Sequence, residues 1–365
     1  MKIFYLITKS EIGGAQTHLV DLCRYFHGRG HEILVMSGGN GWLKEECDKI
    51  GVRYQSNSFF SNSVNPLKIY QAIREIKKCA NGFKPDIVHC HSSAAAFLGR
   101  LAIKGKIKTI YTAHGWGFNV GMNQFLRYSV LLAEKAVAKF TDKYICVSEF
   151  VKKLGLKYSL ASENKFTVIY NGVKTDGEEI GLKNNDKINL IFVGRLAEPK
   201  KPEMVIEAID FFPQDLKNKI KFTIVGDGPK KEFLQRMVAR ENVEVDFKGT
   251  LSREKSMEEL CLADVFVFIS AWEGFPYTIL EAMSVGLPVV ASNVGGVAEV
   301  VSENNGFLIK NEICEISEVL LKLVNNKELR LQLGQNGKDR IKKDFSLEKM
   351  LDEIDKVYVE MIKVK

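Results

Sequence analysis

Short apolar segments alternate with longer segments of helical periodicity along nearly the whole chain of 365 residues. Segments 3–7 and 265–269 are continuously apolar, as expected of strands covered on both faces. Segment 16–28, like others between the strands, has the spacing of an amphipathic helix. The alternation predicts an α/β protein with parallel, doubly wound sheets. The predicted strands are 3–8, 32–37, 86–90, 109–113, 143–147, 189–193, 221–225, 243–248, 265–269 and 288–291.

The alternation is interrupted once, at a polar stretch rich in glycine and asparagine. We interpret residues 175–187 as a linker between two Rossmann-like domains of similar size, residues 1–174 and 188–345. Residues 346–365 have apolar side chains at helical spacing, and we expect this C-terminal helix to pack back on the first domain. Two such domains would face each other across a cleft, with ligands beyond the carboxyl ends of the strands.

The composition is that of an ordinary globular protein. Hydrophobic residues make up 45% and charged residues 27% of the chain, which excludes a disordered or fibrous class. No apolar run approaches the roughly 18 residues that a membrane-spanning helix needs. The seven cysteines are scattered and include no C-x-x-C pair, which favours free thiols in a reducing cytoplasm over a disulfide framework.

Charge is distributed unevenly along the chain. Residues 1–176 hold 25 Lys and Arg against 13 Asp and Glu, a net of +12, whereas residues 177–365 hold 27 against 32, a net of −5. The first half is therefore suited to an anionic partner such as a phosphorylated substrate, a membrane surface or nucleic acid. Its basic amphipathic segments, 66–84, 97–108 and 125–140, fit either an anionic membrane surface or ordinary core helices with basic outer faces.

Two loops after predicted strands have features of anion-binding sites. Gly13 and Gly14 precede a helix, where backbone amides can approach an anion, although a simple tight turn explains the pair equally well. Arg195 and Lys200 follow the first strand of the second domain. Two cations at a strand's carboxyl end can bind a diphosphate, and a surface salt bridge is the competing interpretation.

The most informative segment is 271–283, which follows the predicted strand 265–269. A helix is expected to begin near Pro276 and to offer free backbone amides to ligand oxygens. Glu273 precedes this helix and Glu281 lies one turn into it, so two carboxylates could hold the hydroxyl groups of one ligand. The alternative is a helix-dipole acid together with a solvated loop acid.

Histidines are few. His89 and His91 lie on one face of a predicted strand, which could bind a metal, but no third ligand is nearby in sequence and core packing is favoured for His89. His114 ends the strand at 109–113, at the ligand-binding edge, which favours a functional role. The sequence has no Asp-x-Asp, no P-loop and no G-x-S-x-G motif, and we predict no metal site.

Taken in order, the motifs resemble those of retaining GT-B glycosyltransferases of glycosyltransferase family 4, also called group 1, and especially those of bacterial surface-polysaccharide assembly. The resemblance covers almost the whole chain. The motifs that carry it are Gly13-Gly14, His114-Gly115, 168–173, Gly194-Arg195-Leu196 with Lys200, 225–229, 247–249, Glu273 with Glu281, 286–292 and 294–296. Lys201 departs from the pattern, in which glycine or asparagine commonly follows the diphosphate-binding lysine.

The resemblance implies a role for each matching residue. Arg195 and Lys200 would hold the donor diphosphate, Glu281 the ribose, and Glu273 the transferred sugar, with His114 facing the reacting sugar. The catalytic set is thus His114, Glu273, Arg195 and Lys200. The implied donor-binding set is Gly13, Gly14, Arg195, Lys200, Gly226, Gly249, Glu273, Gly274, Phe275, Pro276, Tyr277 and Glu281.

The implied activity is transfer of a hexose from a nucleoside-diphosphate sugar, a UDP-sugar by preference, to a lipid-linked glycan, without metal or resident cofactor. The expected partners are a polyprenyl-diphosphate-linked acceptor and the anionic inner face of the cell membrane, and not nucleic acid. Two alternatives remain at this stage: an epimerase or hydrolase of nucleotide sugars on the same fold, and a non-catalytic nucleotide-sugar-binding protein.

Overall fold

The computed structural model describes residues 1–363 except 61–64, 119–122, 176–186 and 242. The chain forms two compact units. Unit 1 comprises Met1–Asn171 and Met350–Lys365, and unit 2 comprises Gly172–Lys349. Most of the segment predicted as a linker, 175–187, lies outside the described residues.

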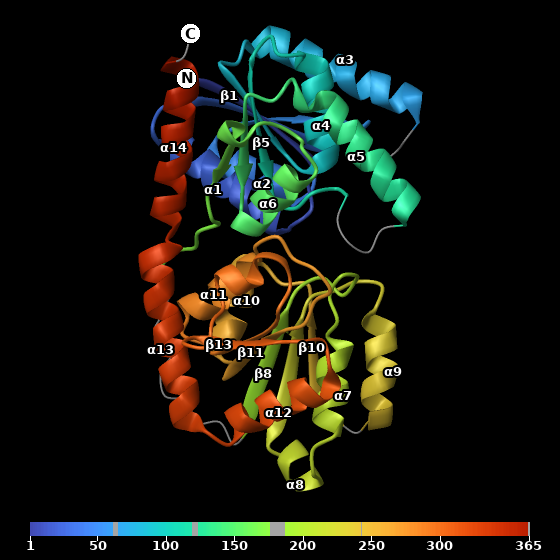
Figure 1. The fold of residues 1–365 in the computed structure, drawn as a ribbon, viewed down its shortest axis with the longest axis vertical. Coiled ribbons are helices and arrows are strands. Elements are labelled where there is room, and N and C mark those ends of the chain that lie inside the picture. The colour runs from blue at the N-terminus through green and yellow to red at the C-terminus, as the bar shows by residue number, and fades with distance from the viewer. Residues whose placement is uncertain (61–64, 119–122, 176–186, 242, 364–365) are drawn as a thin grey trace. The chain divides into compact units, whose positions relative to one another are not determined.

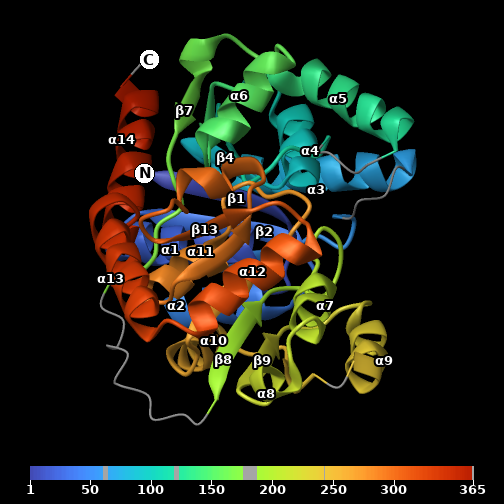
Figure 2. The ribbon, with the colours of Figure 1, turned by 60° about the horizontal axis from the view of Figure 1, so that its bottom comes forward.

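Unit 1 is built on a seven-stranded sheet in the order β3-β2-β1-β4-β5-β6-β7, in which every pair of neighbouring strands is parallel. The strands are β1 (Lys2–Lys9), β2 (Glu32–Gly38), β3 (Arg53–Ser56), β4 (Ile87–His91), β5 (Lys108–Ala113), β6 (Lys143–Cys146) and β7 (Phe166–Val168). The helices are α1 (Gly14–Gly28), α2 (Trp42–Ile50), α3 (Pro66–Phe83), α4 (Ser93–Ile103), α5 (Gln124–Ala138), α6 (Glu149–Lys157) and, mostly in this unit, α14 (Leu347–Lys363). Helices α3, α4 and α5 lie side by side in Figures 1 and 2, and α4 packs on β1, β4 and β5.

Helix α14 completes the core of unit 1 next to α1 (Figure 1). The ring of Tyr358 stacks on Phe26 of α1, with 4.8 Å between the ring centroids. Its hydroxyl lies 2.5 Å from Nδ1 of His89, whose Nε2 lies 2.7 Å from the Thr112 hydroxyl. His89 is fully buried, as the core interpretation of this residue predicts. Helix α14 is therefore hydrogen-bonded, through Tyr358, to His89 on β4, the central strand of the unit 1 sheet.

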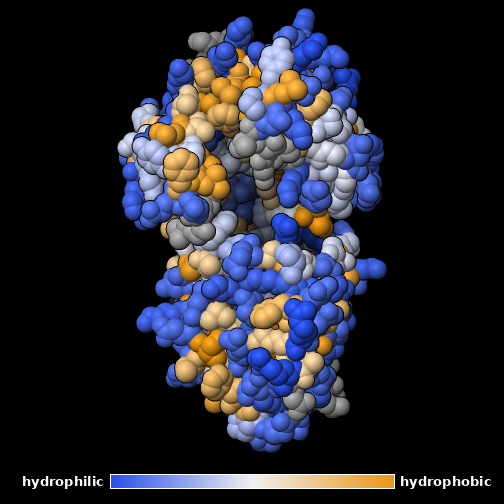
Figure 3. Space-filling model, turned by 90° about the vertical axis from the view of Figure 1, so that its right-hand side faces the viewer, coloured by the Kyte–Doolittle hydropathy of each residue, from blue (hydrophilic) through white to orange (hydrophobic). Residues whose placement is uncertain are grey.

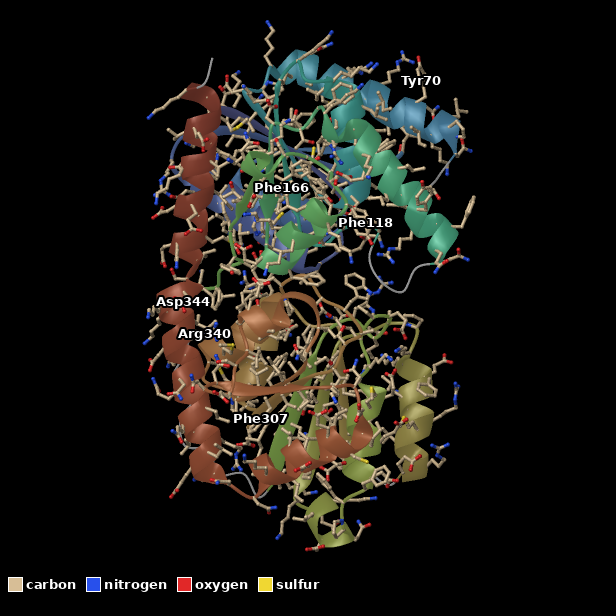
Figure 4. The ribbon with its side chains drawn as sticks, in the orientation of Figure 1. Tyr70, Phe118, Phe166, Phe307, Arg340 and Asp344 are labelled. Atoms are coloured by element: carbon tan, nitrogen blue, oxygen red, sulfur yellow. The ribbon has the colours of Figure 1, made fainter. Side chains whose placement is uncertain are left out.

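Unit 2 is built on a six-stranded parallel sheet in the order β10-β9-β8-β11-β12-β13. The strands are β8 (Ile188–Val193), β9 (Ile220–Val225), β10 (Val245–Gly249), β11 (Val265–Phe268), β12 (Val289–Ser292) and β13 (Gly306–Ile309). The α-helices are α7 (Glu203–Asp210), α8 (Gln214–Lys217), α9 (Lys231–Glu241), α10 (Arg253–Cys261), α11 (Tyr277–Ser284), α12 (Ile313–Val324) and α13 (Lys327–Asp344). Helix α7 packs with α9 and α12, whereas α11 packs with α10 and α13 (Figures 1 and 2). On α13, Arg340 lies 4.0 Å from Asp344, one turn further along, and Figure 4 labels both residues.

The α/β prediction is confirmed, and each of the ten predicted strands overlaps an observed strand. Three strands were not predicted: β3, β7 and β13. All three lie at sheet edges, where a strand has one hydrogen-bonded neighbour, and β3 is also polar, so no apolar run marks it. Among the described residues, no helix is both long enough and apolar enough to cross a membrane, and all seven cysteines are free thiols.

A buried ion pair joins α4 to α5. The Arg100 guanidinium donates two hydrogen bonds to Glu134, of 2.6 and 2.7 Å, and a third of 2.8 Å to the Ala96 carbonyl. Arg100 is fully buried and Glu134 is 6% exposed. Burial opposes the charge of the guanidinium, but the Glu134 carboxylate more than offsets this effect and raises the pKa of Arg100 above its ordinary value. The pair fixes the spacing of the two helices.

We expect Arg100→Met to destabilise unit 1 by about 3–5 kcal/mol, because it leaves the Glu134 carboxylate buried without its cation. The double variant Arg100→Met with Glu134→Leu should recover most of that loss, since a matched apolar pair removes the uncompensated charge. Urea unfolding monitored by circular dichroism measures both. A single variant as stable as the double variant would contradict this account of the pair.

Candidate active site

The carboxyl end of the unit 2 sheet brings Lys200, Ser270 and Glu273 together. The Lys200 ammonium forms an ion pair with Oε1 of Glu273. The Ser270 hydroxyl donates a 2.6 Å hydrogen bond to the same carboxylate oxygen. Backbone pairing of Lys200 with Ser270 aligns the loop after β8 with the end of β11. A lysine and a glutamate 73 residues apart in sequence thus share one polar cluster.

Lys200 is held in place from several sides. Its ammonium lies 4.0 Å from the centroid of the Phe268 ring, within range of a cation–π interaction. Its carbonyl accepts a 2.7 Å hydrogen bond from the Lys230 ammonium, which also bonds Glu203. Burial lowers the pKa of Lys200 below its ordinary 10.5, and the Glu273 carboxylate opposes that shift. An ammonium has three donors, so the pair with Glu273 leaves donors that can bind an anionic oxygen.

Two glycines allow the loops around this cluster to approach closely. Gly226 has φ of +143°, and a β-carbon there would lie 1.9 Å from the Gly194 carbonyl oxygen. Its amide donates a 2.8 Å hydrogen bond to the carbonyl of Gly249, which joins the ends of β9 and β10. Gly295 has φ of +58°, and a β-carbon there would lie 1.8 Å from the Glu273 carbonyl oxygen. A side chain at either position would force these loops apart.

Helix α11 begins four residues after Glu273. Pro276 is its N-cap, one residue before Tyr277, which agrees with the predicted start. Gly274 and Pro276 are buried, and Phe275 and Tyr277 are only 4% and 7% exposed. The two aromatic side chains therefore serve the core, and the backbone amides of this turn are the groups that can bind a ligand.

The two remaining charged candidates of unit 2, Arg195 and Glu281, differ in exposure. Arg195 follows β8 by two residues and is exposed. Glu281 is 8% exposed and accepts a 2.9 Å hydrogen bond from Nε of Arg253, at the first turn of α10. Sequence reasoning missed both Arg253 and Lys230. The available signal was their position shortly after strand ends, since Arg253 begins the helix that follows β10 and Lys230 lies in the loop that follows β9.

In unit 1, His114 lies beside two other histidines. Its Nε2 is 3.2 Å from Nδ1 of His91, and its ring meets His18 of α1 edge-on, with 4.9 Å between the centroids. Burial lowers the pKa of His114 well below 6.5, and the neighbouring His18 and His89 lower it further. The pKa values of His18 and His91 are also lowered by burial, that of His18 to about 4. All three imidazoles are therefore neutral near pH 7.

His18, His91 and His114 each offer a nitrogen, and these nitrogens lie within 4.8 Å of one another, so the cluster has a composition that could hold a metal ion. In the sequence, His89 and His91 share one face of a strand and no third ligand lies nearby. The fold instead supplies one from α1 and another from the end of β5, which sequence spacing could not reveal.

The glycine pair lies at the start of α1. Gly13 is the N-cap, with φ of 176°, which is extended backbone open to any residue, and Gly14 is the first helical residue. A β-carbon on Gly13 would lie 2.9 Å from Oε1 of Gln16, a flexible side chain. The backbone conformation therefore does not itself require glycine at position 13, and the helix N-terminus supplies the anion-binding character.

Two parallel α/β units with polar residues at the carboxyl ends of their sheets define the GT-B fold. Residues 12–176 match the family described as Glycosyltransferase Family 4, and residues 173–340 match Glycosyl transferases group 1. The chain belongs to this family of retaining glycosyltransferases, which use nucleotide-sugar donors.

Similar proteins agree with this assignment. The UDP-Gal:α-D-GlcNAc-diphosphoundecaprenol α-1,3-galactosyltransferase of Escherichia coli is 31% identical over 321 residues, which cover 82% of each chain. The Escherichia coli O-antigen biosynthesis glycosyltransferase WbnH is 28% identical and covers 89% of this chain and 90% of its own. The structure of Anabaena HepE in complex with UDP and glucose superposes with a TM-score of 0.83 at 18% identity, over 98% of this chain and 99% of HepE. The structural similarity to HepE confirms the fold.

We expect Glu273→Gln to lower the pKa of Lys200 further, because burial then acts without the opposing carboxylate. Lys200 should become reactive toward acetic anhydride at a lower pH than in the unmodified protein, as measured by mass spectrometry between about pH 7 and 10. Ser270→Ala, which removes a hydrogen-bond donor and keeps the charge of Glu273, is the matched control and should leave the Lys200 titration close to that of the unmodified protein. Identical titrations in Glu273→Gln and the control would contradict the role of this pair.

Proposed function

We propose that this protein transfers a hexose from a UDP-sugar to a hydroxyl of a lipid-linked glycan during synthesis of a bacterial O-antigen, capsule or exopolysaccharide. The observation that carries the proposal is the Lys200–Glu273 pair, a partly buried cation beside a carboxylate at the carboxyl end of a parallel sheet. The names of the two Escherichia coli relatives support the donor and the pathway class.

Lys200 and Arg195 act on the leaving group. Cleavage of the bond from the sugar to the diphosphate places negative charge on the departing nucleotide and positive charge on the sugar ring. A pre-positioned ammonium and guanidinium stabilise the negative charge as it develops. No step of this scheme requires a metal ion. The exposed Arg195 can form a bidentate contact with a phosphate, whereas the partly buried Lys200 acts as a point charge.

Carboxylates and amides hold the sugar and ribose. Glu273 keeps one oxygen on Lys200 and Ser270, which leaves its other oxygen to accept a hydrogen bond from the transferred hexose. The backbone N–H groups of Phe275 and Tyr277, on either side of Pro276, bind the same sugar. Glu281, oriented by Arg253, accepts hydrogen bonds from the ribose hydroxyls. The loops at Gly226 and Gly249 frame the nucleobase.

His114 contacts the reacting sugar from unit 1. Because burial keeps its imidazole neutral, it can donate and accept hydrogen bonds without placing a second positive charge beside an oxocarbenium-like sugar. Gly13 and Gly14 offer the N-terminus of α1 to the donor diphosphate.

The acceptor is a polyprenyl-diphosphate-linked sugar, presented at the cytoplasmic face of the cell membrane with the protein bound peripherally. Two observations support this choice. The galactosyltransferase relative is named for a diphosphoundecaprenol acceptor. The first 176 residues carry a net charge of +12, which suits both a diphosphate and an anionic lipid surface.

Arg195→Ala and Lys200→Ala should each lower kcat by about 10²–10³-fold, as removal of one charge-stabilising donor does in other enzymes. Radiolabelled UDP-galactose and UDP-glucose with a GlcNAc-diphosphoprenyl acceptor provide the assay. Arg236→Ala, which removes a guanidinium that is 73% exposed on α9, is the matched control and should retain full activity.

Normal turnover in both site variants would reject the proposed diphosphate clamp. Incubation of donor without acceptor separates the other reaction classes. Rapid acceptor-independent loss or isomerisation of the UDP-sugar would favour a hydrolase or epimerase. Donor binding without turnover toward any acceptor would favour a non-catalytic binding protein.

A further inference from the structure

Unit 1 contains a cavity of about 760 Å³ bordered by α3, α4 and α5. Apolar side chains from all three helices line it, among them Ile69 of α3, Phe97 and Leu98 of α4, and Val130 of α5. The volume falls in the range of small-molecule sites, and lining of this kind favours an apolar ligand. None of the proposed donor-binding residues lines this cavity.

The same cavity also has polar lining, from the carboxyl ends of β1 and β4. Thr8, Lys9 and Ser92 contribute to it, and the hydroxyls of Thr8 and Ser92 lie 2.6 Å apart. Ser92 directly follows His91, the histidine that contacts His114. The cavity therefore connects an apolar space between helices with the sheet edge that carries the histidine cluster.

Charge in the cavity favours an anion at this polar part. Lys9 is the basic residue of the lining, and Glu134 is the acidic one. The bidentate bond from Arg100 compensates the Glu134 charge. The ammonium of Lys9 is thus the uncompensated charge among the residues that line the cavity.

Large hydrophobic side chains stand exposed on the two outer helices. Leu67 and Tyr70 of α3, and Phe125, Tyr128 and Leu132 of α5, are between 49% and 84% exposed. Figure 4 labels Tyr70 on α3, and Figure 3, which views unit 1 from the side of α3 and α5, shows hydrophobic side chains gathered in patches on this face. Exposed apolar patches of this kind mark binding surfaces for apolar partners.

We propose that this cavity binds the first isoprene units of the acceptor lipid, with the lipid diphosphate at Lys9 and the attached sugar toward His114. The inference rests on the proposed function, because it locates the acceptor of that reaction. A polyprenyl diphosphate has the matching chemistry: an apolar branched chain joined to an anionic group. Each methylene group that leaves water for the cavity favours binding.

The cavity favours a single lipid chain over the surface of a bilayer as its occupant. A bilayer can contact the protruding side chains of α3 and α5, whereas Leu98 of α4, which lines the cavity, is only 5% exposed. An inserted chain can reach such a residue. The exposed side chains around it would then cover the part of the chain that leaves the cavity.

The direct test is binding of a fluorescent farnesyl diphosphate to the full-length protein. Ala133→Trp on α5 and Ala94→Trp on α4 fill the cavity from opposite helices. Each should weaken binding at least about tenfold, which corresponds to about 1.4 kcal/mol. The matched control is Ala136→Trp, the same substitution at an exposed position of α5 outside the cavity lining, which should bind as the unmodified protein does. Circular dichroism and Tm verify that the variants fold. If one of the two filling variants does not fold, the other still tests the proposal.

Competition identifies which part of the ligand is recognised. Unlabelled farnesyl diphosphate should displace the probe at far lower concentration than inorganic diphosphate does. Equal affinity in all four proteins, or equal displacement by inorganic diphosphate, would overturn the proposal. Loss of binding to phosphatidylglycerol vesicles in the filling variants, with farnesyl diphosphate binding intact, would also overturn it and identify a bilayer surface instead.

A transfer assay separates this inference from the proposed function. With a long-chain GlcNAc-diphosphoprenyl acceptor, the filling variants should raise the acceptor KM at least about tenfold and leave the donor KM unchanged. With a GlcNAc-diphosphate carrying a short propyl chain, they should match the control. Equally efficient transfer to the long-chain acceptor in all variants would reject the cavity as the lipid site and would leave the proposed function unaffected. Absence of transfer in the unmodified protein would reject the function, while the binding measurement still decides the cavity.

Discussion

Parallel pairing throughout both sheets is the constraint on which the candidate sites depend. Because every strand in a unit runs in the same direction, all carboxyl ends lie along one edge, and the loops that leave them converge. In unit 2 this convergence places Lys200, from the loop after β8, against Glu273, from the loop after β11. In unit 1 it places His91 at the end of β4 beside His114 at the end of β5. Both contacts follow from strand order, since β8 pairs with β11 and β4 pairs with β5.

A buried ion pair, Arg100–Glu134, and a partly buried one, Lys200–Glu273, have different consequences. Arg100 directs its donors at Glu134, a backbone carbonyl and nearby hydroxyls, so its charge is satisfied inside the protein. Lys200 shares a single carboxylate oxygen with Ser270, and burial lowers the pKa of its ammonium. The first pair fixes two helices in relation to each other. The second keeps a cation close to an acid while leaving donors that a ligand can use.

Most of the fold could be predicted from the sequence because interior strands of parallel sheets are continuously apolar. The strand β3, Arg53-Tyr54-Gln55-Ser56, is polar because it lies at an edge, and no apolar run marks it. Strand ends and the family resemblance made Lys200, Glu273 and His114 candidates, and the structure brings Lys200 and Glu273 into contact. The same reasoning could not find Arg253 beside Glu281 or His18 beside His114, because those contacts depend on how helices pack over the sheet.

The bond from Tyr358 to His89 ties the end of the chain to the middle of unit 1. Unit 1 is discontinuous, and its residues 350–365 follow the whole of unit 2. During synthesis, the sheet of unit 1 emerges from the ribosome long before the helix that covers His89, and unit 2 is complete in the meantime. Until then, His89 lacks its bond to Tyr358, so unit 1 cannot complete its core before unit 2 has been made.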